Sequence, residues 1–145
     1  QRMVGSLLHL STTTRPDLSY ATSQLSRFCA DPRSAHMRAA KHTLRHLSGH
    51  LKLGMTYSRS HGEKAIATAY VDSSYAADPQ TRKSVTGMLI FACGGLVAWF
   101  SRRQSTVAQS TCEAEYLGIG MAAQVIVYIR GLLEQMCFVQ RDPTR

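Results

Sequence analysis

Two stretches of this 145-residue chain decide its fold: Ala-Tyr-Val-Asp-Ser-Ser-Tyr-Ala-Ala-Asp at residues 69–78 and Ser-Thr-Cys-Glu-Ala-Glu-Tyr at residues 110–116. The first ends a strand-like run, and the second begins a helix-like run. An aspartate at a strand end and a glutamate in the first turns of a helix can converge on one divalent metal ion, the usual apparatus for cutting a phosphodiester. The two stretches therefore predict a metal centre that contains Asp72 and Glu115.

Around these acids the sequence predicts a sheet. Apolar or alternating residues indicate strands at 51–59, 65–72, 85–92 and 96–101. The 65–72 strand is expected to be central, because both of its faces are apolar or small. Cys93-Gly94-Gly95 predicts a hairpin turn between the last two strands. Either Trp99 or Phe100 should enter the core.

Helical spacing accounts for most of the remaining chain. Ser110 followed three residues later by Glu113 predicts a capping box, and apolar residues continue the helix to about Met136. Nearer the N-terminus the pattern predicts the end of a helix at 4–10 and helices at 16–30 and 34–48. Ser34 is the expected N-cap of the last of these, and Gly49 its C-cap. We therefore predict a helical segment at residues 1–50 and a sheet-bearing segment at residues 51–145.

The net charge of +8 is concentrated near the N-terminus. Residues 1–60 contain nine Lys/Arg and two Asp, about +7, whereas residues 61–145 contain eight Lys/Arg and seven acids, about +1. The polar side of the 34–48 helix carries basic side chains and no acid: His36, Arg38, Lys41, His42, Arg45 and His46. Such a face favours binding to a nucleic-acid backbone. A solvated basic surface is the alternative.

Composition narrows the class of protein. A hydrophobic fraction of 44% permits an ordinary core. No uninterrupted apolar run approaches the ~20 residues of a membrane span, so we expect no membrane association. Four widely separated cysteines argue against a zinc site and indicate a reducing, intracellular compartment, not secretion. The first residues, Gln-Arg-Met-Val, are not a signal peptide, and we expect a piece of a longer chain.

The two acids have competing roles. Asp72 ends an apolar strand, so its carboxylate is expected at the rim of the sheet, although it could instead cap a turn. Glu115 lies about one turn into its helix and could bind metal or compensate the helix dipole. Glu113 points elsewhere, because residues two apart on a helix do not share a face.

Oxygen ligands of this kind indicate Mg²⁺ or Mn²⁺. A pair of ions needs more than two carboxylates. Four other acids do not end a further apolar strand: Asp78, Glu113, Glu134 and Asp142.

The chain resembles the Pol polyproteins of copia-type retrotransposons over nearly its whole length. Residues 3–59 resemble the end of the reverse transcriptase thumb and its connection, through Val-Gly-Ser-Leu-Leu-His-Leu (4–10), Thr-Arg-Pro-Asp-Leu-Ser-Tyr-Ala (14–21) and Ala-Ala-Lys-His-Thr-Leu-Arg-His-Leu-Ser-Gly (39–49). Residues 66–139 resemble the start of the family's ribonuclease H domain, through residues 72–78, Thr-Arg-Lys-Ser-Val-Thr-Gly (81–87), residues 99–104 and residues 110–116.

The resemblance implies an α/β fold: a truncated ribonuclease H-like mixed sheet of about three to four strands with one long helix, preceded by two or three helices of a reverse transcriptase thumb or connection. It implies that Asp72 and Glu115 bind the catalytic Mg²⁺ or Mn²⁺. The second Asp of many members is Ser74 here, and the family's third and fourth acids have no counterpart. The two-metal site would then be incomplete and the fragment inactive.

The resemblance also implies a substrate and partners. The intact parent would hydrolyse the RNA strand of RNA–DNA hybrids, with the rest of the Pol polyprotein as partner, in a cytoplasmic virus-like particle or the nucleus. Basic residues at the hairpin ends would contact the hybrid backbone: Arg82, Lys83, Arg102 and Arg103.

Two alternatives remain at this stage. One is a non-catalytic nucleic-acid-binding module derived from a mobile element, which would use the helix residues Arg38, Lys41 and Arg45 and the hairpin arginines. The other is a structural domain in which Asp72 and Glu115 never meet.

Overall fold

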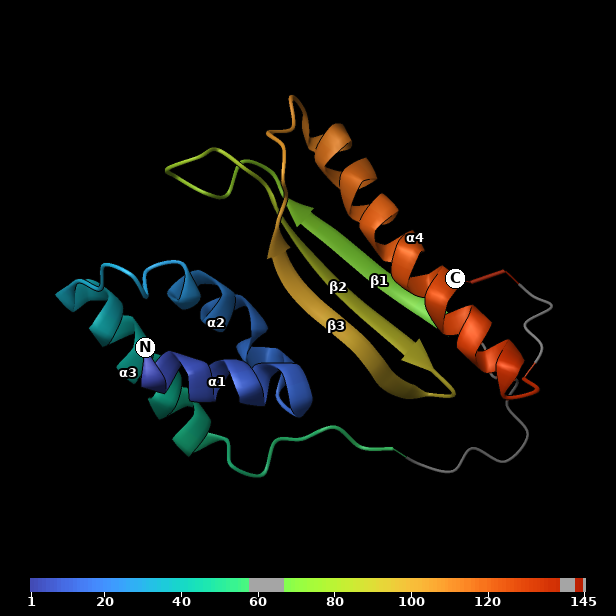
Figure 1. Ribbon diagram of the computed structural model, residues 1–145, viewed down its shortest axis with the longest axis horizontal. Coiled ribbons are helices and arrows are strands. Elements are labelled where there is room, and N and C mark those ends of the chain that lie inside the picture. Colours follow the sequence, from blue (N-terminus) through green and yellow to red (C-terminus); the bar gives the residue numbers. More distant parts are fainter. Residues whose placement is uncertain (58–66, 139–142, 145) are drawn as a thin grey trace. The chain divides into compact units, whose positions relative to one another are not determined.

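The chain divides into two compact units, Gln1–Met55 and Thr56–Arg145 (Figure 1). The computed structural model describes residues 1–57, 67–138 and 143–144 of the chain. The division falls after Met55, whereas the sequence suggested residue 50.

The first unit is a cluster of helices. Its elements are α1 (Arg2–Thr13), the 3-10 turn η1 (Pro16–Leu18), α2 (Ser19–Ser26) and α3 (Ser34–Gly49). The helices α1 and α3 both pack on α2, around the buried side chains of Leu7, Leu18, Leu25 and Ala40. The expected helix at 16–30 is shorter in the structure. Residues 16–18 form the 3-10 turn, and after Ser26 the Phe28 and Cys29 N–H groups donate to the Leu25 and Ser26 carbonyls in turns, three residues back instead of four.

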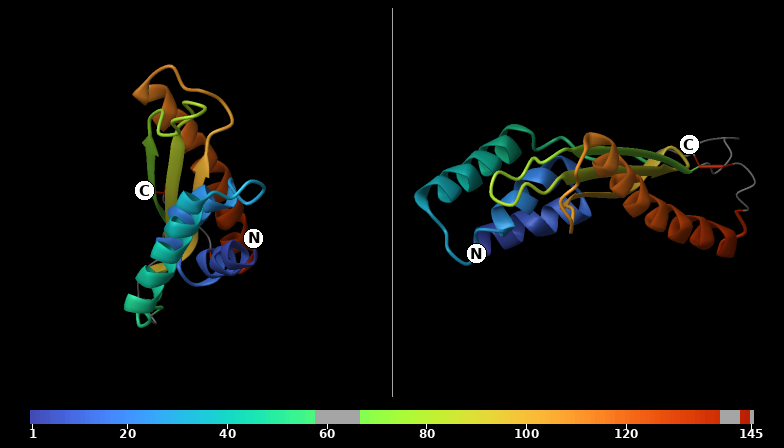
Figure 2. Two further views of the ribbon diagram at one scale, coloured as in Figure 1. Left: turned by 90° about the vertical axis from the view of Figure 1, so that its left-hand side faces the viewer. Right: turned by 90° about the horizontal axis from the view of Figure 1, so that it is seen from above.

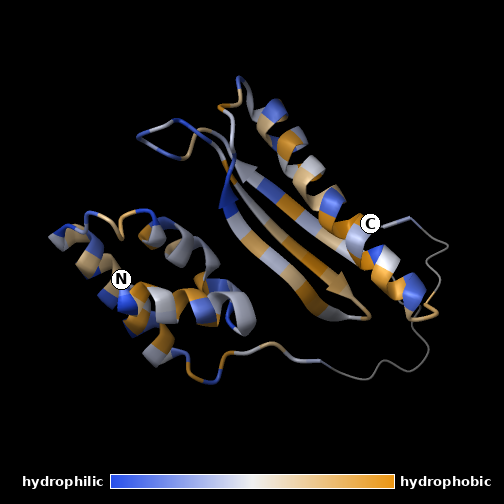
Figure 3. Cartoon of the chain, in the orientation of Figure 1, coloured by the Kyte–Doolittle hydropathy of each residue, from blue (hydrophilic) through white to orange (hydrophobic). Residues whose placement is uncertain are grey.

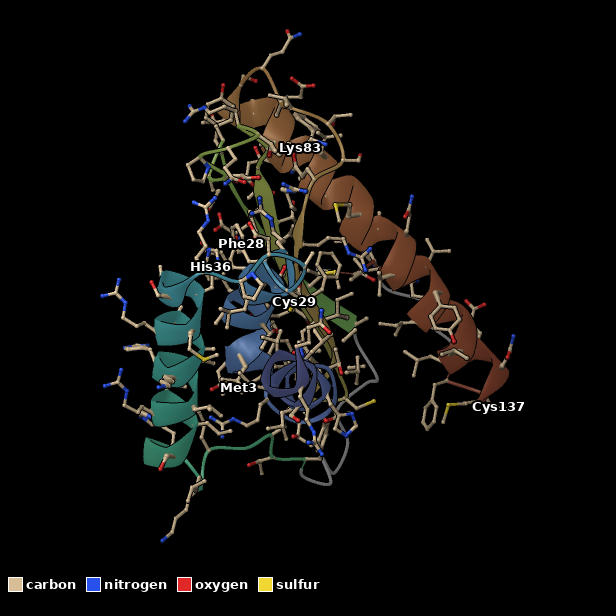
Figure 4. The ribbon with its side chains drawn as sticks, turned by 60° about the vertical axis from the view of Figure 1, so that its left-hand side comes forward. Met3, Phe28, Cys29, His36, Lys83 and Cys137 are labelled. Atoms are coloured by element: carbon tan, nitrogen blue, oxygen red, sulfur yellow. The ribbon has the colours of Figure 1, made fainter. Side chains whose placement is uncertain are left out.

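The start of α3 is capped differently from the prediction. Arg33, not Ser34, occupies the N-cap position, and its N–H donates to His36 Nδ1 at 3.0 Å. The His36 ring stacks on Phe28 with 4.0 Å between centroids, and Figure 4 shows the two side chains together. His36 therefore has a structural role at this helix end.

A buried arginine ties the η1 turn to the end of α3. Arg15 Nε and Nη2 donate to the Asp17 carboxylate at 2.9 and 2.8 Å, and Arg15 Nη1 donates to the His50 carbonyl at 3.1 Å. His46 Nε2 lies 2.9 Å from the same carboxylate. The hydrogen bonds from Arg15 are the main reason that the pKa of Asp17 falls from 3.8 to about 2. The same bonds raise the pKa of Arg15.

The second unit is a sheet covered on one face by a helix. Strands β1 (Ala67–Ser74), β2 (Val85–Ala92) and β3 (Gly95–Arg103) are antiparallel and lie in that order. Helix α4 (Thr111–Gln135) packs on β1 and β2, and the right-hand view of Figure 2 shows it along one side of the sheet, which is seen there nearly edge-on. The β2–β3 hairpin turns at Cys93 and Gly94, whose φ angles of 52° and 77° suit a two-residue turn.

The core of this unit lies between the sheet and α4. Met88, Ile90 and Ala122 are its buried residues, and Figure 3 shows the hydrophobic residues gathered on β2 and along α4. Phe100 packs against this core, which confirms the expectation that one of the two adjacent aromatics is internal. No described helix of this unit covers the opposite face of the sheet, here called the open face, and Tyr70 there is 62% exposed.

Three details of the predicted sheet are wrong. Residues 51–57 form no strand, and the rest of the predicted 51–59 strand lies outside the described residues. The described strands are all antiparallel, so this sheet is not mixed. Strand β1 lies at an edge of the described sheet, not at its centre. Its small residues accommodate the close approach of α4. Because small residues are also typical of a strand buried on both faces, the sequence pattern suggested a central strand.

Helix α4 also carries a signal that the sequence analysis missed. By length and composition it is apolar enough to cross a membrane. Glu115 and Arg130 interrupt the apolar run, so the sequence contains no uninterrupted apolar stretch of that length here. In the structure Ala114, Gly118 and Ala122 of this helix are buried, whereas only 11% of the apolar window as a whole is buried.

Candidate metal centre

Asp72 lies near the end of β1, where it pairs with Gly87 of β2. The next residue, Ser73, is buried and faces α4, because its Oγ lies beside Gly118. Successive side chains of a strand point to opposite faces. Asp72 therefore belongs to the open face of the sheet, and its side chain is exposed to solvent.

Glu115 approaches the same strand end from the helix side. Its Oε1 accepts a hydrogen bond from the Ser73 N–H at 3.2 Å. Two covalent bonds of about 1.3 and 1.5 Å separate that nitrogen from the Asp72 Cα, so the carboxylate oxygen lies at most about 6 Å from this Cα. The two predicted acids therefore border the same edge of β1, one from each face of the sheet.

Glu113 is separated from Glu115 by its capping role. The Ser110 Oγ accepts from the Glu113 N–H at 3.1 Å, as the capping box predicted. The Glu113 carboxylate accepts from the Gln109 N–H at 2.7 Å, one residue earlier than the usual capping box places it. The two glutamates therefore have different roles, as expected. Glu113 accepts from the Gln109 N–H at the start of the helix, and Glu115 accepts from the Ser73 N–H of β1.

Gly118 makes the approach of α4 possible. An added Cβ at this position would lie 2.5 Å from Ser73 Oγ and 3.3 Å from Val71 Cγ1. With no side chain here, the helix comes close enough for Glu115, three residues earlier, to reach the main chain of β1. The sequence indicated only that glycines on this helix permit close packing. It did not identify Ser73, whose amide receives the glutamate.

The other acids in the described ranges do not join this site. Asp78 is buried, and its Oδ2 accepts from Arg103 Nη1 at 2.6 Å. Glu134 lies near the end of α4, more than four helical turns from Glu115. Within residues 1–57, 67–138 and 143–144 no three metal-binding side chains of His, Cys, Asp or Glu type form a cluster. The predicted Asp142 lies outside the described residues.

The predicted basic contacts at the hairpin have different environments. Arg103 is paired with Asp78, and Lys83, labelled in Figure 4, donates from Nζ to the Ser105 carbonyl. Arg102 is exposed and lies over the Phe100 ring, 5.4 Å from its centroid. Arg82 is exposed in the turn that precedes β2. Arg82 and Arg102 thus remain the accessible pair.

The predicted basic face of the first unit lies on α3. Arg38, Lys41 and Arg45 are all exposed, at a spacing that places them along one side of the helix. His46 is different, because it is engaged with Asp17. The three exposed cations therefore define the α3 basic face.

Helices followed by an antiparallel three-stranded sheet and one long helix constitute a truncated ribonuclease H-like α/β fold. The chain is 34% identical over 139 residues to the retrovirus-related Pol polyprotein from transposon TNT 1-94 of Nicotiana tabacum, and 33% identical over 134 residues to that from transposon RE1 of Arabidopsis thaliana. These alignments cover 96% and 92% of the chain. The chain belongs to the family of copia-type retrotransposon Pol polyproteins.

The extent of the match differs among relatives. The chain spans 10% of the Nicotiana polyprotein and 9% of the Arabidopsis one. It is also 37% identical over 126 residues to the secreted RxLR effector protein 161 of Plasmopara viticola, and that alignment covers 87% of each chain. No family model and no solved structure matches the chain.

Proposed function

We propose that residues 51–145 of this chain are the first part of the ribonuclease H region of a copia-type Pol polyprotein, preceded in residues 1–50 by the end of the reverse transcriptase thumb or connection, and that Asp72 and Glu115 together bind one Mg²⁺ or Mn²⁺ ion. The observation that carries the proposal is the bond from the Ser73 N–H to Glu115 Oε1 at 3.2 Å. This bond ties the helix acid to the peptide that directly follows Asp72. Membership of the Pol family supports the proposal independently.

The donor set suits a single ion. Mg²⁺ commonly binds through one or two carboxylates and keeps several of its water molecules. Asp72 is exposed at a strand end, and Glu115 is half-buried on the helix side of the same strand edge, so the shared ion would lie at the rim of the sheet, where water can complete its shell. An ion held there would supply the Lewis acidity and water activation used in phosphodiester hydrolysis. A second ion needs further carboxylates, and the described part of the chain offers no third one here.

The proposed activity belongs to the intact parent, which would hydrolyse the RNA strand of RNA–DNA hybrids. We propose that the 145-residue chain by itself does not. A labelled hybrid incubated with the chain and Mg²⁺ or Mn²⁺ should remain intact. Cleavage that disappears in Asp72→Asn would contradict the proposed inactivity while supporting the site.

Metal binding tests the site itself. Electron paramagnetic resonance of Mn²⁺ should show one bound ion per chain, lost in Asp72→Asn and in Glu115→Gln. Glu134→Gln, on the same helix, is the matched control and should bind as the wild type does. Equal binding by all four proteins would overturn the proposed site.

A second candidate function is supported by the α3 basic face. Arg38, Lys41 and Arg45 are exposed, and α3 contains no acid. We propose that this face binds the phosphate backbone of a nucleic acid, with an RNA–DNA hybrid as the expected partner.

Salt dependence tests this second function. If the three cations each neutralise a phosphate, replacing all three by Gln should reduce the slope of log K against log salt by roughly 2–3, from about 0.7–0.9 per phosphate. Lys52→Gln, an exposed cation outside α3, is the control for lost net charge. If the triple substitution leaves this slope unchanged, the α3 basic face does not contact the phosphate backbone and the second function is wrong.

A further inference from the structure

A chain of buried polar groups runs beneath the start of α4. Gln104, which follows β3, is only 4% exposed. Its Nε2 donates to Thr86 Oγ1 at 2.9 Å and to the Ala114 carbonyl at 2.8 Å. The Thr86 hydroxyl in turn lies 3.0 Å from Ser73 Oγ. Thr86 and Ala114 are both fully buried.

These bonds close a ring with the Glu115 contact. Ala114 contributes the peptide that leads directly into Glu115. The Ser73 hydroxyl is hydrogen-bonded with that of Thr86, and the Ser73 N–H donates to the Glu115 carboxylate. The polar ring (Ser73, Thr86, Gln104, Ala114 and Glu115) thus fixes Glu115 twice, through its main chain and through its side chain.

The chemistry of the acceptors sets the orientation of the Gln104 amide. A carbonyl oxygen only accepts, so the amide nitrogen must face Ala114. The amide oxygen Oε1 is then buried, and no donor among the described residues reaches it. An unpaired buried acceptor is unfavourable. An apolar side chain of similar size would fill the same space without burying an unpaired acceptor. Packing alone therefore does not explain why this residue is a glutamine.

We propose that Gln104 is a positioning residue for Glu115. It joins β2 to the first turn of α4 and thereby holds the Glu115 carboxylate against the Ser73 amide. The consequence for metal binding rests on the function proposed above; the positioning itself does not.

Amide hydrogen exchange measured by NMR tests the positioning at one atom. Gln104→Met keeps the length of the side chain and removes both donors. The Ser73 amide should then exchange as fast as it does in Glu115→Ala, while the Met88 and Ile90 amides of the central strand keep their wild-type rates. Gln124→Met, at an exposed position of α4, is the matched control and should change neither.

A second pair of variants opens the ring elsewhere. Thr86→Val keeps the shape of the side chain and removes the hydroxyl, so Ser73 should again lose protection. Thr86→Ser keeps the hydroxyl, so the Ser73 amide should exchange as slowly as it does in the wild type. This pair decides the question if Gln104→Met does not fold.

Two results would overturn the positioning role. One is a Ser73 amide that keeps its wild-type rate in folded Gln104→Met or Thr86→Val. The other is an equal increase in the amide exchange rates of Ser73, Met88 and Ile90, which would indicate a loss of global stability only. Failure of the metal proposal looks different: wild-type protein would show no Mn²⁺ broadening at Asp72 or Glu115, whatever the exchange results.

Discussion

Gly118 is the residue at which α4 comes very close to β1. It shares a buried face of the helix with Ala114 and Ala122, at intervals of four residues. Small residues along that face allow the helix axis to lie near the sheet. The short distance matters for function, because Glu115 reaches the Ser73 amide only from a closely packed helix.

Replacing Gly118 by Ala should therefore destabilise the protein. Alanine favours a helix over glycine by about 1 kcal/mol, but the new Cβ would lie 2.5 Å from Ser73 Oγ and 3.2 Å from Thr86 Cγ2. Overpacking of this kind costs about 1–3 kcal/mol. Urea unfolding should show a net loss for Gly118→Ala and a gain for the control Gly120→Ala, which meets no atom within 4 Å. Equal gains in both variants would contradict the packing described here.

Asp17 should make stability depend on pH in the acid range. Its pKa is depressed from 3.8 to about 2, chiefly by the hydrogen bonds from Arg15. A depressed pKa contributes stability above the unfolded value, and that stability is lost as pH falls from about 4 to about 2. Asp17→Asn should reduce the free energy of unfolding at neutral pH by about 1–2 kcal/mol, with the lower figure favoured because the side chain is 25% exposed.

The check is a series of unfolding measurements on wild type and Asp17→Asn. The difference between them should stay constant above about pH 5 and shrink below about pH 4. Asp31→Asn, an exposed aspartate of the same unit, is the control. A difference that does not change with pH would rule out the Arg15–Asp17 interaction as its source.

Among the elements, the segment between β1 and β2 is organised by Asp78. Its carboxylate, 1% exposed, accepts from Arg103, from the Thr81 hydroxyl and from the Gln80 N–H. Its main chain exchanges hydrogen bonds with Arg82 and Lys83. The sequence indicated only an Asp-Pro turn, because nothing in the local pattern shows that Arg103, on a different strand, points at it.

Arg103→Ala should destabilise the protein by about 2–4 kcal/mol, since it removes a partner from a buried carboxylate. Arg102→Ala should cost less than about 1 kcal/mol, because Arg102 is exposed and lies over the Phe100 ring. Thermal unfolding of the two variants compares adjacent arginines directly. Similar losses would mean that the pair with Asp78 is not stabilising. Because replacing Arg102 should change stability little, Arg102 is better suited than Arg103 to tests of nucleic-acid contact.

Elements with strong local signals were predicted well. The glycine-containing turn set the β2–β3 hairpin, and the Ser110 cap set the start of α4. Local signals failed where tertiary contacts decided the outcome. Strand β1 has small residues because α4 packs closely on it, and the sequence suggested a central strand instead. At the start of α3, His36 Nδ1 accepts from the N–H of the N-cap residue Arg33, whereas Ser34 was expected to be the N-cap.

At the scale of the whole molecule, the candidate site combines residues that were predicted from the sequence with residues that were not. Asp72 and Glu115 came from spacing and from resemblance to the Pol family. Ser73, Thr86 and Gln104 did not, because buried polar residues become visible only when their partners are known. One signal was present: Ser84 and Thr86 alternate with the buried residues Met88 and Ile90, so hydroxyls at 84 and 86 had to face inward.

The central claim is that the acid near the end of β1 and the acid at the start of α4 share one divalent ion. The most direct test is a Mn²⁺ titration followed by amide NMR signals of the wild type, Asp72→Asn and Glu115→Gln. Signals from residues 72–74 and 113–117 should broaden together in the wild type, and either substitution should abolish the broadening at both. Broadening that persists in Asp72→Asn or in Glu115→Gln at the same Mn²⁺ concentrations would show that one carboxylate binds the ion without the other.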